Sequence, residues 1–170
     1  MSAADPVVDE YARAARHYDE KWAFYLEATT RETLRRLPMS PGARVLDIGC
    51  GTGELLRRLR AKYPGAILAG LDPVPEMLAV AKDKLNGTED LRIGYADLLP
   101  WPSCSFDLVV SCNMFHYITH PVEALLEKYR QGDGFISYDK VTEPQRQELS
   151  RAIDALSKEV SQVQGVIAPQ

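Results

Sequence analysis

The sequence lacks the features that mark several classes of protein. Its three cysteines, Cys50, Cys104 and Cys112, contain no CxxC spacing, which argues against a disulfide framework and against a zinc site. No stretch approaches the roughly 18 apolar residues that a membrane span requires. Residues 1–10 are acidic and lack the apolar core of a signal peptide. Free thiols fit a reducing compartment, so we expect a cytoplasmic protein with no metal site and no membrane partner.

Positive charge is also scarce, since the net charge is −4. Binding to nucleic acid normally needs a basic face, so no nucleic-acid partner is expected. The cluster of Arg57, Arg58, Arg60 and Lys62 is either a local basic patch or, as we favour, a solvated helix face. The length of 170 residues suits a single domain, with 45% apolar and 26% charged residues. A monomer or a homodimer fits this size.

Apolar residues recur with helical spacing in the first third of the chain, for example at Tyr11, Ala15, Tyr18 and Trp22, and Pro38 ends this pattern. After residue 40, short strand-like runs alternate with helical patterns. The strand candidates are Arg44–Ile48, Ala66–Leu71, Leu91–Tyr95 and Phe106–Ser111, and the helix candidates cover residues 54–63 and 75–85. Such alternation predicts βαβ units and a mostly parallel sheet.

A glycine-rich segment follows the first of these strands directly. Asp47-Ile48-Gly49-Cys50-Gly51-Thr52-Gly53 lies between a strand and a helix, where glycine permits a sharp turn and lets a ligand approach the backbone. Asp72 ends the second strand, where it is placed to accept hydrogen bonds from a ribose diol. Asp97 follows the third strand, within reach of an adenine amino group. The three acidic residues are expected at one edge of the sheet.

These residues resemble the motifs of the class I S-adenosylmethionine (SAM)-dependent methyltransferases. Residues 47–53 look like motif I, Gly70-Leu71-Asp72-Pro73 with Met77-Leu78 resembles the second motif, and Ala96-Asp97 with residues 106–109 resembles the next two. The resemblance covers about residues 11–122. It implies a Rossmann-like three-layer α/β sandwich with a mostly parallel sheet, SAM as cofactor and methyl transfer to a small-molecule acceptor. The expected sheet is shortened at its C-terminal side and carries helical N- and C-terminal segments.

The resemblance also implies roles by position. Asp47 is expected near the amino group of the cofactor, Asp72 at the ribose, and Asp97 with Leu98 at the adenine. The full set of expected cofactor-binding residues is Asp47, Gly49, Cys50, Gly51, Gly53, Asp72, Pro73, Met77, Ala96, Asp97, Leu98, Tyr11 and Tyr18. The two tyrosines either close over the cofactor as a lid or pack on the domain. His116 either acts as a base on the acceptor or has a structural role, which we favour.

A nicotinamide-dependent oxidoreductase is the enzyme class that most needs excluding. The glycines here read GxGxG after an acidic residue rather than G-x-G-x-x-G. A carboxylate beside the first glycine repels a pyrophosphate but suits a cationic cofactor with a free amine. The sequence therefore favours SAM.

The C-terminal part departs from the methyltransferase pattern. Residues 132–138 supply a turn and a possible fifth strand that would pair with the fourth, and Leu149, Ile153, Leu156, Val160 and Val163 form an apolar helical stripe. About residues 125–166 resemble the C-terminal segment of imelysin-like (EfeO-type) iron-uptake proteins, without the metal-binding part of that family. We therefore divide the chain into an N-terminal helical lid (1–40), a SAM-binding domain (41–140) and a C-terminal helix and tail (141–170). The alternatives to a methyltransferase are a non-catalytic SAM-binding or assembly module, and a truncated or fused methyltransferase without activity.

Overall fold

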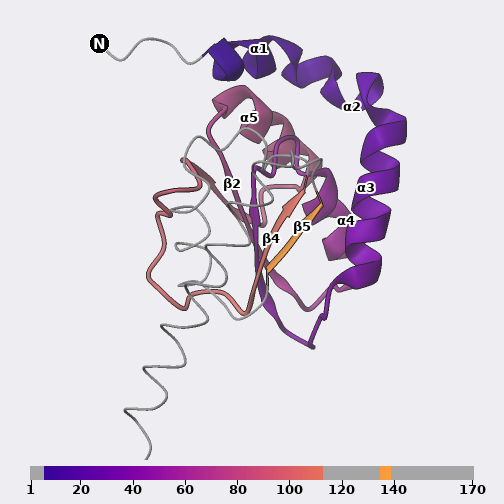
Figure 1. Cartoon of the computed structure of the whole chain (residues 1–170), viewed down its shortest axis with the longest axis vertical. Helices are drawn as coiled ribbons and strands as arrows, with labels where there is room; N and C mark the ends of the chain where they lie inside the picture. The colour runs from indigo at the N-terminus through magenta and orange to yellow at the C-terminus, as the bar shows by residue number, and fades with distance from the viewer. Residues whose placement is uncertain (1–5, 113–134, 139–170) are drawn as a thin grey trace, which may run out of the picture.

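The computed structural model describes residues 6–112 and 135–138, which form a parallel sheet flanked by helices (Figure 1). The strands are β1 (Arg44–Ile48), β2 (Ile67–Asp72), β3 (Asp90–Ile93), β4 (Leu108–Cys112) and β5 (Phe135–Tyr138). Their order in this five-stranded sheet is β3-β2-β1-β4-β5, and every neighbouring pair is parallel. The strand order reverses between β1 and β4. In sheets of this kind, ligands bind beyond the carboxyl ends of the strands at such a reversal.

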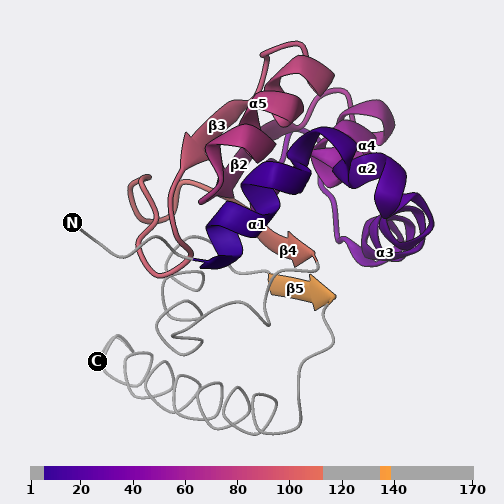
Figure 2. The same cartoon turned by 90° about the horizontal axis from the view of Figure 1, so that it is seen from above.

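The expected α/β order is confirmed, and the helices fall where the sequence placed them. Between strands, α4 (Glu54–Lys62) joins β1 to β2, and α5 (Pro75–Lys84) joins β2 to β3. Before β1 come α1 (Pro6–Ala14), the short 3-10 helix η1 (Ala15–His17), α2 (Tyr18–Lys21) and α3 (Ala23–Arg36). These N-terminal helices run along one side of the domain, with α1 and α2 beyond one end of the sheet (Figures 1 and 2).

The N-terminal helical stretch is broken rather than continuous, contrary to the uninterrupted apolar spacing of the sequence. Ala15 is buried and packs with Val74 and Met77, so the chain bends at η1 to follow α5. Trp22 leaves helical geometry between α2 and α3, with φ −111° and ψ 17°, and its side chain is 44% exposed. Trp22 therefore marks a second bend instead of continuing the buried stripe.

Both faces of the sheet are apolar, as a sheet covered on both sides requires. Along β1, Val45 packs with leucines of α4 such as Leu56 and Leu59, whereas Leu46 and Ile48 point to the opposite face. On that second face the described cover is the segment after β3, including Leu99 and Phe106. The largest of these side chains are fully buried, and each contributes roughly 1.5–3 kcal/mol to folding.

The fourth strand begins two residues later than the sequence suggested, at Leu108 rather than Phe106. The carboxylate of Asp107 accepts hydrogen bonds from the backbone N–H of Arg44 (2.8 Å) and from its guanidinium (2.8 Å), which lower the pKa of Asp107 to about 2. Phe106 packs edge-on against Trp101, with ring centroids 5.4 Å apart. The side chains of Phe106 and Asp107 thus have partners on Trp101 and Arg44, just before the strand begins.

The expected fifth strand is present and shields β4 from becoming the edge of the sheet. β5 pairs with β4 in parallel register, with Val109 opposite Phe135 and Cys112 opposite Tyr138 (Figure 2). The segment that resembles iron-uptake proteins, about residues 125–166, lies outside the described residues apart from β5 itself. Within residues 6–112 and 135–138, no helix is long and apolar enough to cross a membrane.

Candidate functional site

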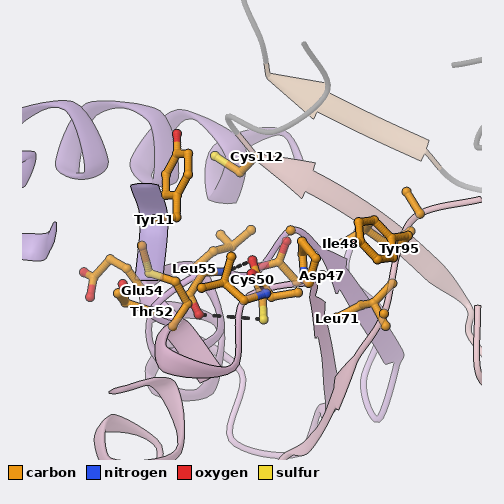
Figure 3. Close-up of a pocket in the computed structure, with 18 of the residues that line it drawn as sticks. Tyr11, Asp47, Ile48, Cys50, Thr52, Glu54, Leu55, Leu71, Tyr95 and Cys112 are labelled. Carbon is orange, nitrogen blue, oxygen red and sulfur yellow. Dashed lines mark hydrogen bonds between the residues drawn. The ribbon is translucent and has the colours of Figure 1, made fainter. Parts of the chain in front are cut away.

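A cavity of about 400 Å³ lies at the carboxyl ends of the central strands and is lined in part by residues of α1 (Figure 3). Its volume falls within the roughly 300–1,000 Å³ typical of small-molecule sites. Its walls come from the N-terminal helices, the loop after β1, the ends of β2 and β4, and the segment after β3. They are lined by Val7, Val8, Tyr11, Tyr18, Leu26, Thr30, Asp47, Ile48, Gly49, Cys50, Gly51, Thr52, Glu54, Leu55, Leu71, Asp72, Pro73, Val74, Met77, Gly94, Tyr95, Ala96, Asp97 and Cys112.

The glycine loop between β1 and α4 is held in place by its own backbone amides. The N–H groups of Gly49 and Cys50 both donate to the carbonyl of Leu71, at 2.7 and 3.0 Å. The N–H of Gly51 donates to Oδ2 of Asp72 at 2.8 Å. The N–H of Gly53 donates back to the carbonyl of Cys50 at 2.8 Å. The loop is therefore fastened to the end of β2 at several points.

The glycines of this loop have different surroundings. Gly51 has φ +51°, and a Cβ built on it would have no neighbour within 4 Å, so its bare backbone faces open space. Gly53 has φ +76°, but a Cβ there would lie 3.0 Å from Cβ of Ala81 on α5. The absence of a side chain therefore leaves the space beside Gly51 open and permits helix packing at Gly53.

Two carboxylates of the cavity wall are buried. Asp47 is 2% exposed and Asp72 is 7% exposed. Oδ1 of Asp72 accepts a hydrogen bond from the N–H of Val74 at 2.9 Å, while Oδ2 accepts from Gly51. Burial raises the pKa of Asp72, and these two amide hydrogen bonds oppose that rise only in part. Each oxygen of an ionised carboxylate accepts more than one hydrogen bond, so Asp72 retains capacity for ligand donors.

The charge of the cavity wall is one-sided. Asp47, Glu54, Asp72 and Asp97 are acidic, and no described residue of the wall is basic. Partial burial works to raise the pKa of Glu54, but hydrogen bonds from Arg57 and Arg58 outweigh it and lower the pKa to about 2. A negative wall of this kind favours a cationic ligand over an anionic one.

A dinucleotide pyrophosphate does not suit this loop. Pyrophosphate sites of Rossmann domains present free backbone N–H groups to the ligand. Here Gly49, Cys50 and Gly51 already donate within the protein, and Asp47 lies buried beside them. The geometry therefore supports the preference for SAM that the order of the glycines suggested.

The structure brings most of the expected cofactor residues to this one cavity. Those that line it are Tyr11, Tyr18, Asp47, Gly49, Cys50, Gly51, Asp72, Pro73, Met77, Ala96 and Asp97. Gly53 does not line the cavity and lies against α5. Leu98 does not line it either and is 79% exposed. His116 lies outside the described residues. Within those residues, no cluster of three or more His, Cys, Asp or Glu side chains is placed to hold a metal ion.

Several lining residues were not singled out as ligand contacts from the sequence. Val7, Val8, Leu26 and Thr30 come from α1 and α3, and only tertiary packing brings them to the ends of the strands. Thr52 and Glu54 belong to the glycine loop and to the first turn of α4. Their position inside or next to motif I was a usable signal. Cys112 reaches the cavity as the last residue of β4 (Figure 3).

The family of the chain follows from comparison with known proteins. Residues 45–131, half of the chain, match the methyltransferase domain family. The chain belongs to this family. Its Rossmann-like fold is that of class I SAM-dependent methyltransferases, and SAM is the cofactor. The bare backbone at Gly51, the internally bonded loop amides and the acidic wall fit this cationic cofactor.

Two curated relatives and one solved structure illustrate the similarity. The chain is 33% identical over 139 residues to a malonyl-[acyl-carrier protein] O-methyltransferase of Geobacter sulfurreducens, covering 78% of this chain and 51% of that protein. It is 36% identical over 94 residues to a trans-aconitate 2-methyltransferase of Methylobacterium nodulans, covering 55% of this chain and 36% of that protein. The structure of a Haloferax volcanii methyltransferase in complex with the Trm112 activator aligns with a TM-score of 0.69 and 31% identity, covering 81% of this chain and 61% of that one. The chain thus spans about half the length, or less, of these two curated relatives.

Proposed function

We propose that this chain transfers the methyl group of SAM to a small-molecule acceptor by direct in-line displacement. The observation that carries the proposal is the acidic cavity, in which buried Asp47 and Asp72 flank a loop whose backbone is bare at Gly51. When bound, SAM supplies a methyl group on a positively charged sulfur, which is a good leaving group. The contribution of the chain is then to orient this group toward the acceptor and to exclude water.

The proposed roles follow the walls of the cavity. Asp47 holds the amino group of the cofactor, and Asp72 accepts hydrogen bonds from both ribose hydroxyls. Asp97 lies at the adenine, and Tyr11 and Tyr18 form part of a lid over the site. In support, these two tyrosines contact each other with ring centroids 5.8 Å apart, and both line the cavity.

The acceptor side is proposed at the end of β4, near Cys112 and Thr30. The relatives named above act on malonyl-[acyl-carrier protein] and trans-aconitate, judging by their names, and a small organic acceptor is our proposal for this chain. His116 follows β4 by four residues, and its role as the base remains a hypothesis. The three cysteines, which have no CxxC spacing, support a cytoplasmic location.

We keep the division into a lid (1–40), a SAM-binding domain (41–140) and a tail (141–170) as part of this proposal. A module that binds SAM without catalysis is the alternative, since the observations above concern the cofactor side of the cavity. Binding of cofactor is common to both proposals. Turnover separates them, and it is measured as transfer of labelled methyl from SAM across a panel of small acceptors.

The first test is calorimetric titration of the full chain with S-adenosylhomocysteine (SAH), the demethylated product. We expect one site with micromolar affinity, and no heat from NAD at the same concentrations, because the amides of Gly49, Cys50 and Gly51 already donate within the protein. A folded protein that binds no SAH contradicts the proposed function. NAD binding with similar affinity contradicts the inference that the acidic wall favours a cationic ligand.

Cofactor affinity is expected to depend on pH through Asp72. Its pKa is raised by burial, and a protonated carboxyl loses acceptor capacity for the ribose hydroxyls. Affinity for SAH should therefore fall as pH decreases, beginning above the pH range in which an ordinary aspartate titrates. The measurement is the SAH dissociation constant from about pH 8 to about pH 5. Asp72→Asn should show a flatter profile, and an identical pH dependence in this variant would contradict the role of Asp72.

A further inference from the structure

Three polar side chains from distant parts of the sequence meet beside the cavity. Oγ1 of Thr52, in the glycine loop, donates to Oδ1 of Asp19 on α2 at 2.5 Å. Nζ of Lys84, at the end of α5, donates to Oδ2 of Asp19 at 2.5 Å and to Oγ1 of Thr52 at 3.3 Å. The three residues thus form a closed triangle that joins the N-terminal helices, the cofactor loop and α5.

The triangle is shielded from solvent enough for its hydrogen bonds to contribute to stability. Thr52 is 2% exposed, and the side chains of Lys84 and Asp19 are 16% and 39% exposed. Nζ of Lys84 also lies 3.6 Å from the carboxylate of Glu54. Hydrogen bonds to charged groups are stronger than neutral ones, and partial burial reduces the screening that weakens ion pairs on open surfaces.

The triangle lies next to residues that line the cavity. Tyr18 lines the cavity and precedes Asp19 directly. Tyr11, Tyr18 and Val8 pack against Ala15, Val74 and Met77, so apolar contacts hold the N-terminal helices to α5. Asp19 provides a polar connection from the same helices to the glycine loop. Neither Asp19 nor Lys84 lines the cavity, whereas Thr52 does.

We propose that Asp19 and Lys84 are positioning residues that latch the N-terminal helices to the cofactor loop through Thr52, and so retain bound cofactor. This inference rests on the proposed function, because the retained ligand is SAM or SAH. Departure of the ligand past Tyr18 requires α2 to move away from the loop, which breaks the bonds of Asp19. Removing those bonds therefore accelerates dissociation more than it slows association.

The test compares Asp19→Ala with Glu20→Ala in the full chain. Glu20 is the next residue of the same short helix, with an 89% exposed side chain, so it controls for the loss of an acidic side chain in α2. Surface plasmon resonance with SAH should give a dissociation rate at least about ten-fold faster for Asp19→Ala, with an association rate within about three-fold of wild type. Glu20→Ala should match wild type in both rates.

Two further variants separate a latch from a general loss of structure. Thr52→Ser keeps the hydroxyl, so SAH should still dissociate slowly from it. From Thr52→Val, SAH should dissociate as fast as from Asp19→Ala. In the double variant Asp19→Ala with Thr52→Val, the two effects should not add, because both remove the same connection. Hydrogen exchange of the amides of residues 11–22 in ligand-free protein should be faster in Asp19→Ala than in Glu20→Ala.

The outcomes distinguish the latch from the function on which it rests. A folded wild-type protein that binds no SAH overturns the proposed function and, with it, the retention role. Binding by wild type with equal dissociation rates in Asp19→Ala and Glu20→Ala overturns the latch alone. Fully additive effects in the double variant also overturn it, because they show that Asp19 does not act through Thr52.

Discussion

Replacing Asp72 with alanine is expected to weaken SAH binding by about 100-fold. Two hydrogen bonds from ribose hydroxyls to an ionised carboxylate would be lost, and hydrogen bonds to charged groups contribute roughly 1.5–3 kcal/mol each. The lower limit of this sum, about 3 kcal/mol, corresponds to a change in affinity on the order of 100-fold. Part of the effect is indirect, because the substitution also leaves the N–H of Gly51 without the carboxylate that fixes the loop. Titration calorimetry of the folded variant measures the change.

Two variants make this result specific to the carboxylate. Asp72→Asn preserves the shape and one carbonyl acceptor, so we expect a loss of affinity smaller than that of alanine. Asp83→Ala removes an exposed acid from α5 and should leave the dissociation constant within about two-fold, which is less than 0.5 kcal/mol. If Asp72→Ala binds SAH as tightly as Asp83→Ala does, the assignment of the ribose to Asp72 is wrong.

The sequence predicted the order of the central elements because their signals are local. Each signal lies within a few residues of the element that it predicts. Examples are the apolar run of β1, the glycines that end this strand, and Pro75 at the start of α5. The bends at Ala15 and Trp22 were not predictable in this way. The bend at Ala15 follows from packing against α5, whose surface is formed far away in the sequence.

The same distinction applies to the site. Asp72 was expected at the cavity because strand ends in a parallel sheet share one edge. The hydrogen bond that it accepts from Gly51 depends on the register of β1 against β2, which periodicity does not contain. The triangle around Asp19 likewise depends on tertiary packing, since its members lie 33 and 65 residues apart from Asp19 in the chain. Motifs therefore identified the class of ligand, whereas the contacts that organise the loop were visible only in the three-dimensional structure.

Gly53→Ala is expected to destabilise the ligand-free protein by about 2–5 kcal/mol. The left-handed φ of +76° costs an L-residue roughly 1–2 kcal/mol. The new methyl group would also lie 3.0 Å from Cβ of Ala81 and 3.1 Å from Cδ1 of Leu85, and such overpacking costs roughly 1–3 kcal/mol. Ala81 is fully buried in α5, so it has little freedom to move away. Urea denaturation followed by circular dichroism measures the loss.

Gly51→Ala is the matched control, since it makes the same substitution in the same loop at a similar φ of +51°. Its Cβ would meet nothing within 4 Å, so only the conformational cost of roughly 1–2 kcal/mol should appear. If both variants lose the same stability, Gly53 does not pack against α5 as described. If Gly53→Ala is the less stable and Gly51→Ala is the weaker binder of SAH, the two glycines of one motif serve different purposes. Gly53 then allows α4 to pack on α5, and Gly51 keeps the backbone open to the cofactor.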